Sequence, residues 1–125
     1  QKLTDKLMKM KSSSIVVITS IWGDTGASCE VLYSMVKGGQ NAFVKGLSKE
    51  LAPMGVRVNA VSPGAVATEM MNNFSSEEID EIAEDIPMGR LAKPEEIASS
   101  ISFLLSDQAS YITGHVLRVN GGWYT

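Results

Sequence analysis

The sequence predicts an α/β fold built on a parallel β-sheet, and three observations support this prediction. Residues 15–19 (IVVIT) form a continuous β-branched run, which is typical of a strand buried on both faces. Residues 56–61 and 115–119 are two further short strand candidates. Segments with helical periodicity separate the three strands, so βαβ units with right-handed crossovers are expected. At 125 residues, the chain is predicted to be a single domain covering 1–125.

The chain begins with a predicted short helix and a turn. Leu3, Leu7 and Met10 recur at helical spacing, and the serines at 12–14 interrupt the pattern. The first strand follows at once. After it, glycines at 23 and 26 predict a loop.

The longest helix is predicted for residues 32–52. Its buried side is expected to carry an apolar stripe at i, i+4 and i+8, formed by Phe43, Leu47 and Leu51. Pro53 ends this helix. The second strand is expected to close before Pro63, because proline cannot continue a central ladder.

Two more helices are predicted in the second half of the chain. Ser75 and Glu78 match a capping box at the start of a short helix, and the loop before it carries Met70, Met71 and Phe74. Pro94 suits the first turn of another helix. The apolar stripe of that helix consists of Ile97, Ile101 and Leu104.

Composition and charge narrow the classes of partner. Hydrophobic and charged residues make up 44% and 20% of the chain, as in soluble globular proteins, and no apolar run is long enough to span a membrane. The net charge of -3 provides no basic field for nucleic acid. Cys29 is the single cysteine and His115 the single histidine, so neither an intrachain disulfide nor a zinc cluster is expected. We therefore predict a cytoplasmic protein with no metal site, no nucleic-acid partner and no membrane contact.

Tyr33 and Lys37 are the first candidates for chemistry. Residues four apart on a helix are neighbours, so both polar ends can reach one small volume. A nearby ammonium favours the phenolate form of a tyrosine, which can then exchange a proton with a carbonyl or alcohol oxygen. Ser20 ends the first strand and could hydrogen-bond the same oxygen. A solvated lysine beside an amphipathic tyrosine is the alternative interpretation of the pair taken alone.

A series of short motifs carries a family resemblance. In chain order they are Ile18-Thr19-Ser20, Tyr33-x-x-x-Lys37, Arg57-Val58-Asn59-x-Val61-x-Pro63-Gly64-x-x-x-Thr68, Gly89-Arg90, Pro94-Glu95-Glu96, Ile112-Thr113-Gly114 and Val119-Asn120-Gly121-Gly122. Each is weak alone, but together their order and spacing resemble the short-chain dehydrogenase/reductase family. The most similar members by motif are 3-oxoacyl-[acyl-carrier-protein] reductases.

The resemblance implies a fold and a set of site residues. The fold is the C-terminal part of a Rossmann-like doubly wound parallel sheet, with three strands and flanking helices, without the N-terminal glycine-rich βαβ half. The implied catalytic residues are Ser20, Tyr33 and Lys37. The implied cofactor-binding residues are Tyr33, Lys37, Pro63, Gly64, Val66 and Thr68. The implied reaction is NAD(P)H-dependent reduction of a ketone to a secondary alcohol, with NADPH favoured over NADH.

Part of the family pattern is missing from this sequence. The glycine-rich turn that seats the pyrophosphate is absent, and the loop with Asp24 is interpreted as a substrate-side loop, with a structural turn as the alternative. The chain does not start with Met, so we expect it to be cut from a longer protein whose earlier part carries the fourth catalytic residue, an asparagine. Alone, the chain is expected to self-associate, to bind cofactor poorly and to be nearly inactive.

Several expectations about partners remain open. The substrate is a small-molecule or carrier-bound ketone, and an acidic carrier would be repelled by the carboxylates of residues 77–85. A homodimer or homotetramer is expected, with Gly38 and Gly39 facing a neighbouring subunit. The alternatives are a truncated, non-catalytic oligomerising fragment, a reductase of a ketone on a modified translation factor, suggested by the stretch from Ile21 to Val31, and an epimerase.

Overall fold

The computed structural model describes residues 2–10 and 12–125 and contains a parallel sheet of three strands. These are β1 (Ser13–Ile18), β2 (Val56–Pro63) and β3 (Val116–Val119). Their order in the sheet is β1-β2-β3, so β2 is the central strand. The predicted α/β fold with three contiguous parallel strands is therefore confirmed.

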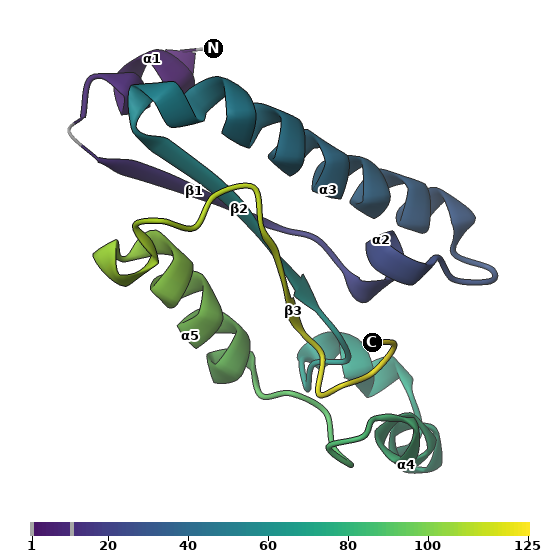
Figure 1. The fold of residues 1–125 in the computed structure, drawn as a ribbon. Coiled ribbons are helices and arrows are strands. Elements are labelled where there is room, and N and C mark those ends of the chain that lie inside the picture. The colour runs from purple at the N-terminus through teal and green to yellow at the C-terminus, as the bar shows by residue number, and fades with distance from the viewer. Residues whose placement is uncertain (1, 11) are drawn as a thin grey trace.

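Helices lie on both faces of this sheet (Figure 1). The α-helices are α1 (Lys2–Met8), α2 (Ile21–Thr25), α3 (Val31–Leu51), α4 (Ser76–Asp85) and α5 (Pro94–Leu105). Short 3₁₀ helices are η1 (Ala52–Met54), η2 (Glu69–Asn73) and η3 (Asp107–Ala109). The helix α3 covers one face and α5 the other, while α4 lies beyond the C-terminal ends of β2 and β3.

The two faces have separate apolar cores because successive side chains of a strand point to opposite faces. On the α3 face, Val56 and Val58 of β2 pack with Val44 of α3. On the α5 face, Val61 of β2 packs with Leu104 of α5. Burial on both faces accounts for the apolar character of β2 and fits the expectation for a parallel sheet.

Two polar residues of β2 bind the chain segment that runs from the end of α5 to the start of β3. The guanidinium of Arg57 donates to the carbonyl of Leu104 at 2.7 Å and to that of Ser106 at 3.0 Å, at the C-terminal end of α5. The fully buried Asn59 donates to the carbonyl of Ile112 at 2.9 Å and accepts from the amide of His115 at 3.0 Å. The Arg57-Val58-Asn59 motif therefore has a structural role in this fold.

Two boundaries in the first part of the chain differ from the predictions. The first helix ends at Met8, so Met10 lies outside it and is exposed. The segment predicted as a loop after the first strand forms α2, a single helical turn. Ser20 caps its start and Gly26, with φ of 71°, ends it. The prediction of a loop was wrong because Gly23 is accommodated inside the turn and Gly26 only ends it.

The end of β2 also differs from the prediction, since Pro63 is the last residue of this central strand. Pro63 pairs with Val119 of β3, and the ladder bond at this level comes from the amide of Gly64, which donates to Val119 at 3.0 Å. The pairing of β1 with β2 stops earlier, at Ile18 and Val61. The N–H that proline lacks would therefore face a position where β1 has already ended.

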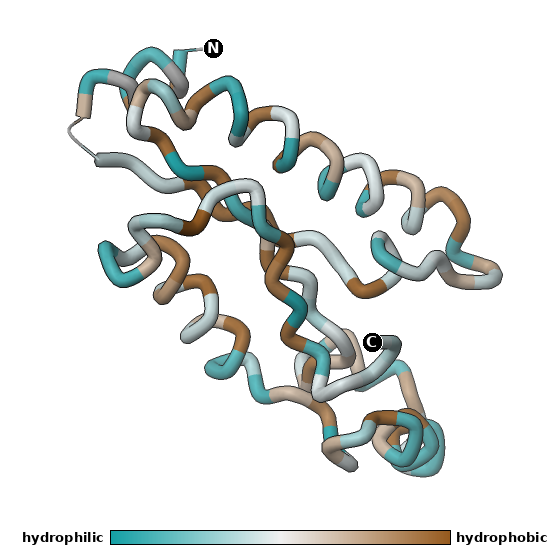
Figure 2. The backbone as a smooth tube through the Cα atoms, viewed as in Figure 1, coloured by the Kyte–Doolittle hydropathy of each residue, from teal (hydrophilic) through white to brown (hydrophobic). Residues whose placement is uncertain are grey.

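The buried side of α3 matches the predicted stripe only in part, since Leu51 is buried and Leu47 packs against the core, whereas Phe43 does not. Its buried residues are Asn41, Val44, Ser48 and Leu51. Phe43 is 56% exposed and lies on the outer side. Apolar residues also occur elsewhere on the outer side of this helix (Figure 2), and they include Val31, Leu32, Met35 and Val36. Because both sides carry apolar residues, periodicity did not identify the one that faces the sheet.

The helices of the second half follow the predictions closely. The capping box of α4 is present, with the Ser75 hydroxyl and the Glu78 carboxylate bonded to each other's backbone amides. The helix α5 starts at Pro94 and buries Ile97 and Leu104. The segment before α4, predicted as a loop, forms η2. Among the described residues, no helix combines the length and apolarity needed to cross a membrane.

Candidate active site

Tyr33 and Lys37 lie on the same side of α3, as their spacing predicted. The ammonium nitrogen of Lys37 is 5.6 Å from the centre of the Tyr33 ring, within the range of a cation–π interaction. Tyr33 is 44% exposed, so its hydroxyl is available to a ligand. This arrangement places a fixed positive charge beside a phenol.

Lys37 also connects α3 to the end of the first strand. Its ammonium donates a hydrogen bond of 3.2 Å to the carbonyl of Ile18, the last residue of β1. Ser20 follows two residues later. The lysine therefore lies between the helix that carries Tyr33 and the segment that carries Ser20.

Ser20 has an extended backbone and is 8% exposed. Its hydroxyl oxygen accepts a hydrogen bond of 3.3 Å from the amide of Trp22, as the N-cap of α2. A serine hydroxyl has one donor and two acceptor positions. Because the cap uses an acceptor position, the proton of Ser20 remains available for donation to another oxygen.

The turn α2 packs against α3 next to Lys37. A Cβ atom at Gly23 would lie 2.7 Å from the carbonyl carbon of Lys37 and 2.9 Å from the amide nitrogen of Gly38. Conversely, a Cβ atom at Gly38 would lie 3.3 Å from the carbonyl oxygen of Gly23. The expectation that Gly38 faces another subunit was therefore wrong, since its close neighbour is α2 of the same chain. Gly39 has open space around it, and its predicted partner is not tested.

The end of β2 carries Pro63 and Gly64. A Cβ atom at Gly64 would lie 3.0 Å from the Cα and Cβ atoms of Asn120, so a glycine is needed where the ends of β2 and β3 meet. This requirement accounts for Gly64 by packing alone. Its predicted contact with a cofactor stays a prediction.

Val66 and Thr68 lie just beyond, in a segment bridged to Ala92. The bridge uses the carbonyl of Ala65 and the amide of Ala67, both bonded to Ala92 at 2.9 Å. In a parallel bridge, the N–H and C=O of the central residue point the other way, so those of Val66 face away from Ala92. The carbonyl of Val66 accepts from the amide of Thr68 at 2.9 Å. Thr68 is exposed, and its side chain makes no capping bond to η2.

The structure thus brings Tyr33 and Lys37 together and links Lys37 to the end of β1, two residues before Ser20. Val66 and Thr68 follow the neighbouring strand β2, at the same edge of the sheet (Figure 1). Ligands of parallel α/β sheets bind at this edge, outside the carboxyl ends of the strands.

Asp24 is a residue whose role the sequence did not reveal. Its carboxylate accepts hydrogen bonds from Asn41 at 3.1 Å, from Ser62 at 2.9 Å and from Arg118 at 3.3 Å. These donors belong to α3, β2 and β3, at sequence separations of 17, 38 and 94 residues. The carboxylate therefore faces the interior of the fold, which supports the alternative of a structural turn, while a place beside the substrate stays a prediction.

An aromatic cluster also joins segments that are distant in sequence. Trp22 of α2 meets Trp123 and Tyr124 edge to face, with ring centres 5.4 and 5.5 Å away. The side-chain amide of Asn120 donates to the carbonyl of Trp123 at 2.6 Å and so fixes this segment. In the sequence, the sole sign of this cluster is that its members are large aromatic residues. That sign does not predict which of them contact each other.

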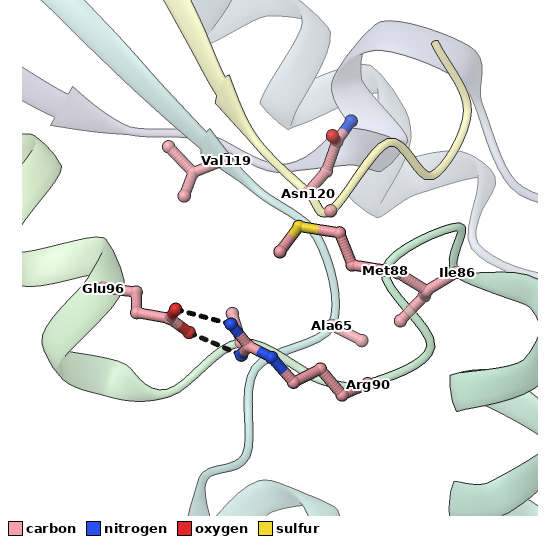
Figure 3. A pocket seen from close by; sticks show the side chains of 9 residues that line it. Ala65, Ile86, Met88, Arg90, Glu96, Val119 and Asn120 are labelled. Carbon is pink, nitrogen blue, oxygen red and sulfur yellow. Dashed lines mark hydrogen bonds and ion pairs between the residues drawn. The ribbon is translucent and has the colours of Figure 1, made fainter.

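A small cavity of about 80 Å³ lies on the α5 side of the same sheet edge (Figure 3). Arg90 and Glu96 face each other across it and form two hydrogen bonds of 2.8 Å. The hydrogen bond from Arg90, aided by one from the amide of Lys93, lowers the pKa of Glu96 to about 2. Since the two charged groups satisfy each other, this cavity offers no free group for catalysis. Within residues 2–10 and 12–125, no group of three or more His, Cys, Asp or Glu is placed to hold a metal ion.

A family model and several known proteins match almost the whole of this chain. A family model described as Enoyl-(Acyl carrier protein) reductase matches residues 1–124. The uncharacterized oxidoreductase YmfI of Bacillus subtilis (strain 168) is 63% identical over 124 residues, which are 99% of this chain and 51% of that protein. The 3-oxoacyl-[acyl-carrier-protein] reductase FabG of Aquifex aeolicus (strain VF5) is 47% identical over 119 residues, covering 95% of this chain and 48% of FabG.

Solved structures agree with these relatives. A crystal structure of 3-oxoacyl-[acyl-carrier protein] reductase from Brucella melitensis ATCC 23457 matches with a TM-score of 0.91 at 34% identity, over 98% of this chain and 46% of that one. A crystal structure of a short-chain dehydrogenase/reductase (glucose/ribitol dehydrogenase) from Brucella melitensis matches with a TM-score of 0.85 at 41% identity, over 91% of this chain and 47% of that one. The chain thus spans about half the length of the relatives it matches.

Proposed function

Because the chain belongs to the short-chain dehydrogenase/reductase family, we propose that it carries the catalytic half of an NAD(P)H-dependent reductase that converts a ketone into a secondary alcohol. The observation that supports this most is the position of Lys37. Its ammonium lies beside the Tyr33 ring and is bonded to the end of β1, close to Ser20. This geometry supports the proposal of Tyr33 as the acid, of Lys37 as the charge beside it, and of Ser20, on the segment that Lys37 contacts, as the hydrogen-bond donor.

In the proposed mechanism, Ser20 donates its free proton in a hydrogen bond to the substrate carbonyl oxygen and holds it. Tyr33 then transfers its phenolic proton to that oxygen as the general acid. The ammonium of Lys37 stabilises the phenolate left on Tyr33. When bound, the nicotinamide cofactor supplies the hydride to the carbonyl carbon. In the reverse direction, Tyr33 acts as the base that accepts the alcohol proton.

The donors on this sheet edge fit the sugar and carboxamide end of such a cofactor. Lys37 offers an ammonium to the ribose hydroxyls, beside Tyr33. The amide of Val66, which faces away from Ala92, and the exposed hydroxyl of Thr68 suit the carboxamide. Pro63 and Gly64 shape the strand end between these groups. The pyrophosphate needs a glycine-rich turn, which residues 1–125 do not contain.

We propose a 3-oxoacyl substrate, either small or bound to a carrier protein, with NADPH as the preferred cofactor. The names of relatives such as FabG of Aquifex aeolicus support this class of substrate. The exposed side chains of Met70 and Phe74 at the same end of the sheet suit an apolar acyl chain. As in the family resemblance, the working protein is proposed to be a cytoplasmic homodimer or homotetramer.

The test is NADPH oxidation with 3-oxoacyl substrates, measured on the full-length protein that contains this chain. Tyr33→Phe removes the transferable proton and should lower kcat by at least about 100-fold. The matched control is Tyr111→Phe, because the side chain of Tyr111 is completely exposed and its hydroxyl lies outside the site. Unchanged turnover in Tyr33→Phe would show that the catalytic assignment is wrong.

A further inference from the structure

The carboxylate of Asp24 lies outside the residues assigned to catalysis and accepts hydrogen bonds from three side chains. Its side chain is 11% exposed. Oδ1 accepts from Asn41, and Oδ2 accepts from both Ser62 and Arg118. The three donors lie on α3, β2 and β3, so this single side chain connects α2 to all three elements.

The element that Asp24 holds is the one that Ser20 begins. The turn α2 covers only Ile21–Thr25, with Ser20 as its N-cap. A helix this short is not stable by itself, because helix nucleation is unfavourable. Its position must therefore come from tertiary contacts, and Asp24 supplies the polar ones.

We propose that Asp24 is a positioning residue that fixes α2, and through it the hydroxyl of Ser20, for the proposed ketone reduction. This inference rests on the proposed function. Gly23 packs α2 against the backbone of Lys37, and the Asp24 network sets the orientation of the same turn relative to the sheet. These contacts thereby fix the position of Ser20 relative to Lys37.

The network is built around a carboxylate. In an Asp24→Asn variant, an amide NH₂ replaces one oxygen. If it stands at the Oδ2 position, it faces the guanidinium of Arg118, which cannot become an acceptor. If it stands at the Oδ1 position, it faces the NH₂ of Asn41, and a bond forms only if Asn41 turns its amide over to present Oδ1, which has no partner in the structure. In either orientation, the negative charge that pairs with Arg118 is lost.

The expected consequence is a change in turnover. Displacement of a substrate-holding group by about 1 Å can lower a rate by up to about 100-fold. We expect Asp24→Asn in the full-length protein to lower kcat about tenfold or more. KM for NADPH should stay within about twofold, because Asp24 is not among the proposed cofactor contacts.

The decisive test is a double-mutant cycle with Ser20→Ala. If Asp24 acts through Ser20, then Asp24→Asn lowers kcat in the wild-type background and causes no further loss in the Ser20→Ala background. A general structural role would instead give losses that multiply, and that result would overturn the inference. Unchanged kcat in Asp24→Asn alone would also overturn it. The matched control is Asp107→Asn, since Asp107 is exposed at the start of η3, and its turnover should equal that of the wild type.

A second variant covers the case in which Asp24→Asn does not fold. Ser62→Ala removes one donor to the carboxylate with a minimal change of volume and should lower kcat about threefold, again only when Ser20 is present. Losses that multiply in this cycle would count against the inference. The proposed function fails separately, because its failure would appear as no ketone reduction by the wild type, or as no effect of Tyr33→Phe, whatever the Asp24 variants do.

Discussion

Gly23 of α2 and Lys37 of α3 are in backbone contact, at a distance that leaves no room for a side chain on the glycine. A Cβ atom at Gly23 would lie 2.7 Å from the carbonyl carbon of Lys37, which is shorter than real contacts allow. Because the carbonyl carbon of Lys37 belongs to the backbone of α3, it cannot move away without shifting the helix. The position of the proposed catalytic lysine is thus coupled to the turn that follows Ser20.

The first prediction concerns this contact. Gly23→Ala should push α2 away from α3, lower the midpoint of urea unfolding and lower kcat of the full-length protein, because Ser20 moves relative to Lys37. The control is Gly46→Ala on α3, where a Cβ atom would meet nothing within 4 Å. That control should raise stability by up to about 1 kcal/mol, as alanine favours helix over glycine. Equal effects of the two substitutions would contradict the close packing of α2 on α3.

The second prediction concerns the charge of Lys37. Lys37→Met removes the ammonium near the Tyr33 ring and its bond to Ile18. Without this charge, the negative charge that develops on Tyr33 during proton transfer is less stabilised. Turnover should therefore fall at least about tenfold in both ketone reduction and alcohol oxidation. The control is Lys49→Met, near the other end of α3, for which turnover should not change.

The third prediction concerns stability at low pH. The hydrogen bonds of Glu96 with Arg90 and with the amide of Lys93 lower its pKa from about 4.5 to about 2. A carboxylate with a depressed pKa contributes stability above the unfolded pKa, and this contribution is lost as the pH falls through the folded one. In the wild type, part of the stability should therefore disappear between about pH 4.5 and about pH 2.

Glu96→Gln tests this directly, because glutamine cannot lose a proton in that range. The thermal unfolding midpoint of the variant should fall less between pH 4.5 and pH 2 than that of the wild type. Glu95→Gln, at the neighbouring exposed position, is the control and should behave like the wild type. A parallel decline of wild type and Glu96→Gln would contradict the prediction.

The fourth prediction concerns residues 1–125 expressed alone. Within the described part of the chain, β1 pairs with β2 on one side only, and α3 exposes Leu32, Met35 and Phe43. An unpaired strand edge next to apolar surface favours association. Sedimentation should therefore show oligomers. Fluorescence titration should show weak NADPH binding, because residues 1–125 do not contain the glycine-rich turn for the pyrophosphate. Micromolar binding by a monomer would refute this expectation.

The elements of the fold followed from local patterns in the sequence. The β-branched run of the first strand, the capping box at Ser75 and Pro94 at a helix start each depend on residues within one short segment. Tyr33 and Lys37 also belong to this group, since their four-residue spacing on a helix brings them together without help from the rest of the chain.

Errors occurred where two local patterns competed. Both sides of α3 carry apolar residues, so the stripe with Phe43 could not be distinguished from the one with Val44 that faces the sheet. The glycines at 23 and 26 indicated a loop, while the packing of α2 on α3 stabilised one helical turn. Tertiary contacts decided both cases because the local differences in free energy are small.

By itself, the sequence determined the order of helices and strands, the parallel sheet and the Tyr33–Lys37 pair, because these depend on residues close together along the chain. Only the tertiary structure decided what Asp24 and Gly23 do. The donors to Asp24 come from Asn41, Ser62 and Arg118, up to 94 residues away. Such a contact exists only after the sheet and α3 have packed, and one sequence carries no periodic signal for it.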